Sequence, residues 1–159
     1  MKKSDLFFSI GAGILALAII LVVVFKFLVT PKPKETFDIQ DIEQIKVTDF
    51  NGDEINLTLF LEKSEVTYML IFQLNDCYSC VYRGLTDLKA LQKEGKQCLA
   101  LVVHDNMEDV QGWSAHEDFS PFLMLKRTDF LEYVNCPHTP VFLKIAKGKI
   151  KSYRYIVAN

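Results

Sequence analysis

The sequence predicts an α/β protein in which one mixed central sheet is flanked by helices. Between residues 66 and 133, apolar runs with the length of buried strands alternate with segments of helical periodicity, and this alternation is typical of α/β folds. Two further strand-like runs follow at 140–146 and 149–155, separated by Lys147-Gly148. A turn of this kind between two strand-like runs predicts a closing hairpin.

A long apolar run precedes this domain. Residues 6–29 contain a single charge, Lys26. A helix of that length, at 1.5 Å per residue, measures about 36 Å and exceeds the roughly 30 Å of a bilayer's hydrocarbon core. A cleaved signal peptide is the alternative, but the run is longer than the usual apolar region, and no small-x-small cleavage site follows. The predicted organisation is an N-terminal tail, a transmembrane anchor, a proline-containing linker and one α/β domain, at 1–5, 6–29, 30–38 and 39–159.

The charge balance limits the partners of the domain. The formal net charge is −2 and no run of more than two basic residues occurs, which argues against a nucleic acid as partner. Lysines flank the apolar run at both ends. The positive-inside rule therefore does not decide on which side of the membrane the domain lies.

The domain is expected to begin with a β-hairpin. Alternating runs at 45–47 and 55–57 enclose Asn51-Gly52, and this dipeptide is a strong hairpin signal. Residues 59–65 are expected to form a helical turn. The apolar stretch 66–74 is expected to form a buried central strand.

Helical periodicity begins at Tyr78. Apolar residues recur at helical spacing along one face, and Gly95 suits the position after the helix; the apolar positions are Val81, Leu85, Leu88 and Leu91. The later elements predicted in chain order are a strand at 98–103, a helix or loop at 107–116, a strand at 122–125, a short helix at 128–133 capped by Thr128 or Asp129, and the strands at 140–146 and 149–155.

Two cysteines lie where the buried strand is followed by the helix. Cys77 and Cys80 are three residues apart, so on the first turn of a helix they share a face and can close a disulfide. The positive end of the helix dipole stabilises a thiolate on the first cysteine. We therefore expect Cys77, nearer the open loop, to be the attacking nucleophile and Cys80 to be the resolving thiol.

Two structural roles for the cysteine pair have less support. A zinc site would need two more ligands, and the sequence contains no second Cys-x-x-Cys and no His-x-x-x-His. An inert structural disulfide is the other role. A disulfide that closes so small a ring adds little stability through chain entropy.

Thr139-Pro140 opens a strand far downstream of the cysteine pair. Together with the hairpin, the strand at 66–74, Cys77-Tyr78-Ser79-Cys80 with its helix, and the Gly148 turn, this pattern resembles the thioredoxin fold. With the apolar N-terminal run, the chain resembles the membrane-anchored TlpA/ResA-like thiol–disulfide oxidoreductases. The resemblance covers roughly residues 39–155, and its specific parts are the Cys-x-x-Cys and Thr-Pro motifs.

The resemblance implies a redox site without a bound cofactor other than a Cys77–Cys80 disulfide. It implies that Pro140 is cis and that a substrate groove is lined by Thr139, Pro140, Tyr78 and Ser79. It also implies that the domain lies outside the cytoplasm, on the periplasmic or outer face of the cell membrane. Its partners would be protein thiols or disulfides and a membrane electron donor or acceptor protein. Whether it reduces, oxidises or isomerises stays open.

The motif departs from many relatives at two positions. They have Trp before the first cysteine and Pro before the second, where this chain has Asp76 and Ser79. An ionised Asp76 beside Cys77 is expected to raise the pKa of that thiol; a local base, a solvated loop residue and a helix N-cap are its other possible roles. Ile71 stands where cytosolic thioredoxins have a buried acid, so the usual proton-handling carboxylate is missing.

Three further residues are candidate modulators or core residues. Cys136 precedes Pro140 by four residues and could capture or shield Cys77, although a buried small apolar residue is the simpler interpretation. Cys98 opens a strand and is expected in the core, and a Cys98–Cys136 bridge stays open. A charged His138 near the pair would favour thiolate, whereas an exposed loop histidine is the simpler interpretation. No metal site is predicted.

The sequence thus predicts a membrane-tethered thiol–disulfide oxidoreductase that acts on extracytoplasmic proteins. The alternative in another class is a non-catalytic copper-binding or chaperone module of the same fold, using Cys77, Cys80 and His138. Such proteins usually separate their cysteines by three residues and place a histidine far downstream, so the match is poor. A peroxiredoxin would carry Thr three residues before its reactive cysteine, where Leu74 stands.

Overall fold

The structure is a computed structural model, and it describes residues 37–157. The predicted anchor at 6–29 lies outside the described residues. Between residues 37 and 157, the structure contains no helix long and apolar enough to cross a membrane. Phe37, which the sequence places in the linker, is buried in the core of the domain.

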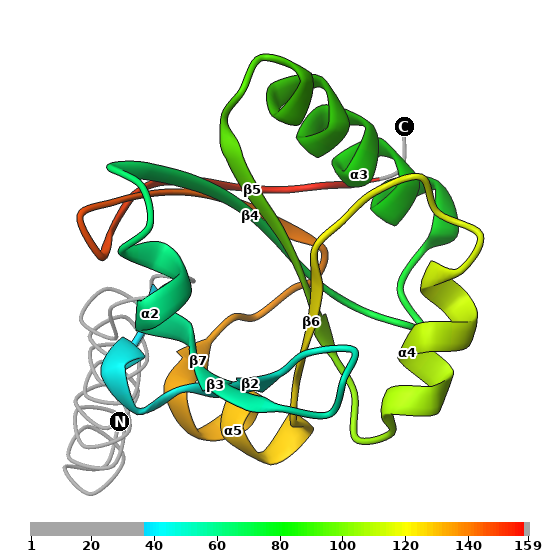
Figure 1. Cartoon of the computed structure of the whole chain (residues 1–159), viewed down its shortest axis with the longest axis horizontal. Helices are drawn as coiled ribbons and strands as arrows, with labels where there is room; N and C mark the ends of the chain where they lie inside the picture. Colours follow the sequence, from blue (N-terminus) through cyan, green and yellow to red (C-terminus); the bar gives the residue numbers. More distant parts are fainter. Residues whose placement is uncertain (1–36, 158–159) are drawn as a thin grey trace, which may run out of the picture. The chain divides into compact units, whose positions relative to one another are not determined.

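A mixed sheet of seven strands forms the centre of the described domain, in the order β3-β2-β6-β5-β4-β8-β9 (Figure 1). β4 pairs in parallel with β5 and antiparallel with β8, so the strand that leads to the cysteine pair is central. A short ladder joins β1 to β7. The strands are β1 (Asp38–Ile39), β2 (Lys46–Thr48), β3 (Glu54–Asn56), β4 (Val66–Gln73), β5 (Gln97–Val103), β6 (Phe122–Leu125), β7 (Val134–Asn135), β8 (Val141–Ala146) and β9 (Lys149–Tyr155).

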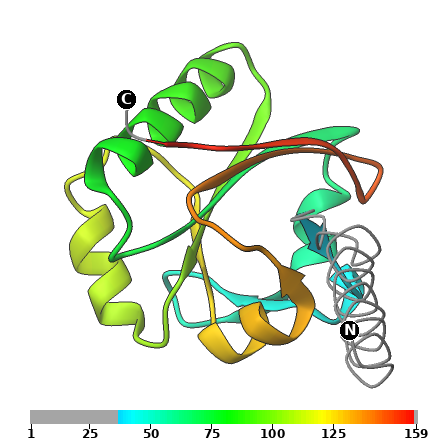
Figure 2. The same ribbon diagram turned by 180° about the vertical axis from the view of Figure 1, so that it is seen from behind.

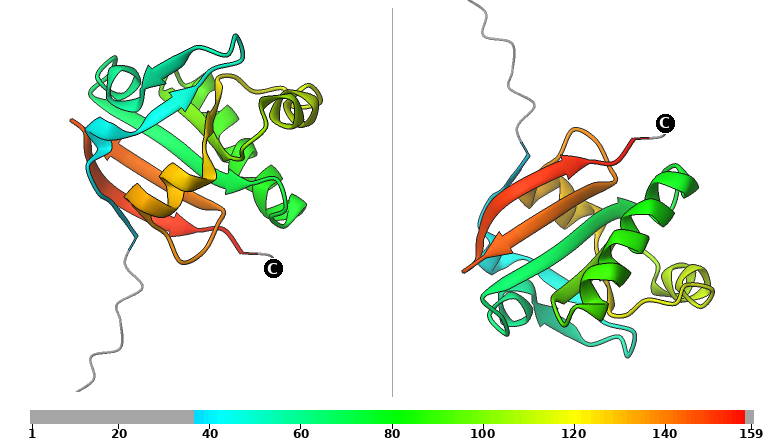
Figure 3. Two further views of the ribbon diagram at one scale, coloured as in Figure 1. Left: turned by 90° about the horizontal axis from the view of Figure 1, so that it is seen from below. Right: turned by 90° about the horizontal axis from the view of Figure 1, so that it is seen from above.

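Helices cover both faces of the sheet. α3 and α4 lie on one side of it, and α2 and α5 lie on the other, as the two opposite views show (Figures 1 and 2). Seen from below and above, the β8–β9 hairpin forms one edge of the sheet (Figure 3). The helices are η1 (a 3-10 turn, Ile42–Gln44), α2 (Leu57–Leu61), α3 (Tyr78–Lys93), α4 (Met107–Ser114) and α5 (Arg127–Tyr133).

Alternate residues of β4 enter two separate cores. Leu70 and Phe72 pack with the apolar face of α3, whereas Met69 and Ile71 pack with the layer that contains α2 and α5. All four side chains have no exposed area. A strand covered on both faces is apolar at every position, which is why this stretch of the sequence shows no alternation.

The predicted order of elements is confirmed, with differences at the helix ends. α2 begins at Leu57, earlier than predicted, because the Asn56 side chain accepts a hydrogen bond from the Thr58 N–H and caps the helix. The predicted cap of α5 is wrong: its N-cap is Lys126, without a side-chain bond. The Thr128 hydroxyl instead donates to Asp129. β1, β7 and η1 have only two or three residues each, too few for a periodic pattern.

The predicted turns are present. Lys147 and Gly148, between β8 and β9, both have positive φ, of 52° and 69°, as a two-residue turn of the type that matches strand twist requires. Gly95, with φ 76°, follows α3, and the Lys96 N–H donates to Leu91 O. The helix that carries the cysteine pair therefore ends where the sequence predicts.

Candidate active site

Cys77 lies at the junction of β4 and α3. A turn closes after β4, with the Asp76 N–H donating to Gln73 O at 3.0 Å. Cys77 is then the N-cap residue of α3, and its carbonyl accepts from the N–H groups of Cys80 and Val81 at 2.9 and 3.0 Å. This geometry leaves the Cys77 side chain exposed and places Cys80 in the core under the first turn, with 4% of its surface accessible.

The two thiols of the pair have opposite pKa shifts. The pKa of Cys77 lies below its ordinary value because its sulfur accepts a hydrogen bond from the Cys80 thiol, and further ones from Ser79 and from backbone N–H groups. Cys77 Sγ and Ser79 Oγ are 3.1 Å apart. The pKa of Cys80 is raised, first by its hydrogen bond to Cys77 and then by burial. A lowered outer thiol beside a raised inner one is the arrangement that nucleophilic attack followed by resolution requires.

Asp76 does not act as the sequence suggests. The prediction that it raises the pKa of Cys77 is wrong, because its charge raises the pKa of Cys80 instead, as the smallest of several causes. Its possible role as the helix N-cap is also wrong, since Cys77 is the N-cap residue. Asp76 is a half-buried loop residue whose carboxylate accepts hydrogen bonds from the Gln73 N–H and the Thr139 hydroxyl, at 2.8 and 2.9 Å.

The Thr139-Pro140 peptide bond is cis, as the resemblance implies. Pro140 is buried and Thr139 is half-buried. The Thr139 hydroxyl also accepts a hydrogen bond from the side-chain amide of Gln73, at 3.3 Å. Thr139 and the cysteine loop therefore meet, and Gln73 joins them. The sequence analysis did not single out Gln73, although it is the polar residue that ends an apolar strand before the cysteines.

The side chains of Tyr78 and Ser79 take different directions. Ser79 reaches Cys77, as described above. Tyr78 is 64% exposed and stacks on Tyr82, one turn further along α3, with ring centroids 6.2 Å apart. The exposed face beside Cys77 is therefore aromatic.

The other two cysteines lie in different cores. Burial raises the pKa of Cys98, in β5, to about 11, and that of Cys136 also to about 11. Cys98 packs with the α3 layer, whereas Cys136 packs against the cluster on the opposite face of the sheet. Both are free thiols, so the suggested Cys98–Cys136 bridge is wrong for this structure. The Cys136 thiol donates to the His138 carbonyl at 2.9 Å.

His138 is an exposed loop residue, and its ring meets Tyr155 edge-on at 5.8 Å. In the part of the chain that the structure describes, no group of three or more His, Cys, Asp and Glu side chains is placed to hold a metal ion. The copper alternative through Cys77, Cys80 and His138 thus gains no support from the geometry.

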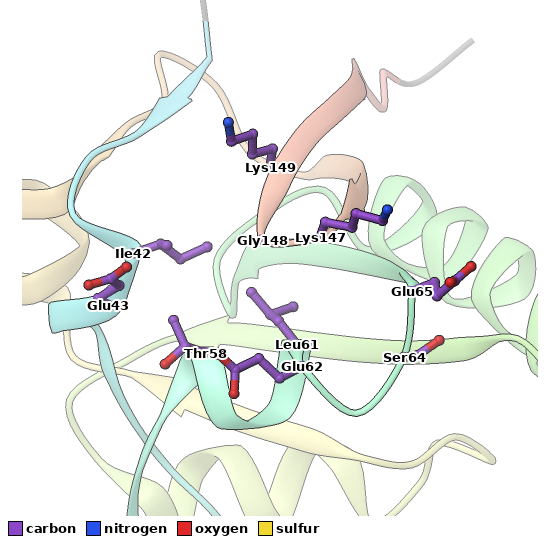
Figure 4. Close-up of a pocket in the computed structure, with 10 residues that line it drawn as sticks. All are labelled: Ile42, Glu43, Thr58, Leu61, Glu62, Ser64, Glu65, Lys147, Gly148 and Lys149. Carbon is purple, nitrogen blue, oxygen red and sulfur yellow. The ribbon is translucent and has the colours of Figure 1, made fainter.

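A pocket of about 480 Å³ lies elsewhere on the domain (Figure 4). Ser64 and Glu65 border it just before the start of β4, and Lys147 and Gly148 border it at the β8–β9 turn. Cys77 follows the other end of β4. The eight residues of β4 span about 26 Å at 3.3 Å per residue, so this pocket is separate from the thiol pair.

No protein-family model matches the sequence, and no curated protein sequence matches it. Solved structures match the fold. A thiol:disulfide interchange protein from Bacteroides sp. aligns with a TM-score of 0.57 and 16% identity, over 69% of this chain and 75% of the other. The thioredoxin domain of a thiol-disulfide oxidoreductase from Bacteroides vulgatus aligns with a TM-score of 0.57 and 15% identity, over 76% and 90%.

A secreted disulfide oxidoreductase of Mycobacterium tuberculosis is also similar, with a TM-score of 0.54 and 12% identity over 72% of this chain and 84% of the other. At such low identities the likeness concerns the fold. The described domain has a mixed α/β thioredoxin-like fold, with a central sheet flanked by helices and the Cys77–Cys80 pair at the junction of β4 and α3.

Proposed function

We propose that this protein is a thiol–disulfide oxidoreductase that exchanges disulfides with protein partners through Cys77 and Cys80. The observation that carries the proposal is the asymmetry of the pair: an exposed thiol with a lowered pKa, at the N-cap of α3, is followed in the first turn by a buried thiol with a raised pKa. The loop of cis-Pro140 reaches the cysteine loop through Thr139. Two of the similar structures described above are named as thiol–disulfide proteins, and the third is named as a disulfide oxidoreductase.

In the reducing direction, the Cys77 thiolate attacks one sulfur of a partner disulfide. A Cys77–partner bond forms, the partner's S–S bond breaks, and the departing sulfur leaves as a thiolate that takes a proton from water. Cys80 then loses its proton to water and attacks Cys77 Sγ, which releases the second partner thiolate. The partner gains two electrons, and Cys77 and Cys80 become a disulfide. The oxidising direction is the same sequence reversed.

The proposal places the domain outside the cytoplasm, tethered by the apolar run 6–29. The length of that run supports the tether, and the secreted Mycobacterium tuberculosis neighbour is consistent with the location. Alkylation of Cys77 in sealed vesicles tests it: an impermeant reagent is expected to label Cys77 from the extracytoplasmic side. Labelling from the cytoplasmic side alone would contradict the location.

Trapping in the native membrane tests the exchange itself. A Cys80→Ser variant lacks the resolving thiol, so it is expected to accumulate a partner bound to Cys77 through a disulfide that a reductant releases. The Cys77→Ser/Cys80→Ser double variant is the control and is expected to trap nothing. If Cys80→Ser traps no protein, or traps no more than the control, the exchange proposal is refuted. Stoichiometric copper that is lost on Cys77→Ser would instead favour the metal-binding alternative.

A further inference from the structure

Three residues form a closed hydrogen-bond network between the two loops of the thiol site, through two side-chain bonds and one bond from a backbone N–H. Asp76 Oδ2 accepts from the Gln73 N–H at 2.8 Å, and Asp76 Oδ1 accepts from the Thr139 hydroxyl at 2.9 Å. The Gln73 side-chain amide donates to the same hydroxyl at 3.3 Å. Gln73 ends β4, Asp76 immediately precedes Cys77, and Thr139 immediately precedes cis-Pro140.

The hydrogen bonds of the network converge on the Asp76 carboxylate and the Thr139 hydroxyl. Both oxygens of the Asp76 carboxylate are occupied, and the Thr139 hydroxyl is at once donor and acceptor. Hydrogen bonds to a charged carboxylate are stronger than neutral ones. All three residues are half-buried, which protects these bonds from competition by water. Asp76 and Thr139 are 63 residues apart in the chain, so this contact fixes two distant segments.

The charge of Asp76 acts on the inner thiol rather than on the outer one. The pKa of Cys80 is raised first by its hydrogen bond to Cys77, then by burial and by the charge of Cys77, and last by the charge of Asp76. The causes of the lowered pKa of Cys77 do not include Asp76.

Building on the proposed exchange reaction, we propose that Asp76 is a positioning residue: it holds the cysteine loop against the proline loop through Thr139, and its negative charge, one residue before Cys77, opposes a second negative charge on the thiol pair. The incoming partner must reach Cys77 beside Thr139 and Pro140, so the spacing of the two loops determines how a partner disulfide is presented. Small misplacements of reacting groups are costly in rate.

Three variants of the full-length protein separate the two parts of the proposal. Asp76→Asn removes the charge but keeps the size of the side chain. Thr139→Val removes the hydroxyl but keeps the charge, and Thr139→Ser restores the hydroxyl. Asp118→Asn, at an exposed loop aspartate, is the matched control for loss of a negative charge. The unfolding midpoint of each variant identifies any that fails to fold.

The first measurement is the ultraviolet titration of the thiolates in the reduced protein, which needs no partner. In Asp76→Asn the ionisation of Cys80 is expected to move to lower pH, because an anion that opposes it has been removed. Thr139→Val and Asp118→Asn are expected to leave it in place. An Asp76→Asn titration that matches the unaltered protein would overturn the electrostatic part.

The second measurement is the rate of exchange with a disulfide-linked peptide. Thr139→Val is expected to lower kcat/KM about tenfold, as the loss of a hydrogen bond to a charged group that aligns the reacting atoms predicts. Thr139→Ser is expected to restore the rate. Equal rates for Thr139→Val and the unaltered protein would overturn the positioning part. If both parts fail while Cys80→Ser still traps a partner, the exchange function stands and only the role of Asp76 is refuted.

Discussion

Gly84 fixes the distance between α3, which carries the thiol pair, and β4. A methyl group at this position would lie 2.7 and 2.9 Å from the two Cδ atoms of Leu70 and 2.8 Å from Ile156 Cδ1. Carbon atoms at such separations overlap strongly, and Leu70 is fully buried in a close-packed core that yields little. Gly84→Ala therefore forces α3 away from the sheet or pushes Leu70 out of its rotamer, at a cost of about 1–3 kcal/mol.

Gly112 provides a matched control in α4. It is exposed, and a methyl group there would meet nothing within 4 Å. Both substitutions gain the same helix propensity, about 1 kcal/mol from glycine to alanine. Gly112→Ala is therefore expected to stabilise the protein by that amount, while Gly84→Ala is expected to be neutral or to destabilise it by up to about 2 kcal/mol.

Urea unfolding of the reduced protein measures the difference. With a denaturant slope of about 2 kcal/mol per molar, a packing term of 1–3 kcal/mol separates the two midpoints by roughly 0.5–1.5 M. The slopes are expected to agree, because the same surface unfolds. If Gly84→Ala is as stable as Gly112→Ala, the close packing of α3 against Leu70 at Gly84 is refuted.

Three further variants test the site and the core. Ser79→Ala removes a hydroxyl 3.1 Å from Cys77 Sγ and is expected to raise the pKa of Cys77, so the rate of Cys77 alkylation should rise at higher pH than in the unaltered protein; an unchanged profile would contradict a donor role for Ser79. Burial raises the pKa of Cys98 from 9.0 to about 11, so its contribution to stability is complete below about pH 9 and is lost as the pH rises towards 11. Cys98→Ala should therefore lose about 1 kcal/mol less stability than the unaltered protein between about pH 8 and pH 10, and equal losses would contradict burial as the cause. Arg154 in β9 donates to Asp87 in α3, and the two side chains are 55% and 39% exposed. Asp87→Asn should therefore cost less than about 1 kcal/mol, and a larger loss in urea unfolding would show that this ion pair is more than a surface contact.

Periodicity was sufficient to predict most of the fold. Local patterns in the sequence were enough for these elements, because each depends on the backbone geometry of neighbouring residues. They are the apolar stretch of β4, the helical face of α3, and the turns at Asn51-Gly52 and Lys147-Gly148. The wrong predictions concern the ends of helices, where a side chain that is not part of the apolar periodicity determines at which residue the helix begins. Asn56 caps α2 and ends β3 at the same residue, and a cap of this kind competes with a strand for the same backbone groups.

The thiol pair was predictable from the Cys-x-x-Cys motif, and cis-Pro140 was predictable from the resemblance to the thioredoxin fold. The network around Asp76 was not, because it joins residues 63 positions apart and depends on where a hydroxyl and an amide point after folding. The sequence places Asp76 beside Cys77, and adjacency suggested that its charge acts on that thiol. In the structure the carboxylate turns to Thr139, and its charge acts on the inner thiol instead.

Equilibration of the purified full-length protein in glutathione buffers of defined ratio tests the central claim most directly. Mass spectrometry of alkylated samples then identifies which cysteines are oxidised at each ratio. The account predicts one reversible intramolecular disulfide between Cys77 and Cys80, with Cys98 and Cys136 still thiols, and the midpoint gives the reduction potential that sets the direction of exchange. A pair that stays reduced across the whole range, or a disulfide that forms only through Cys136, would contradict it.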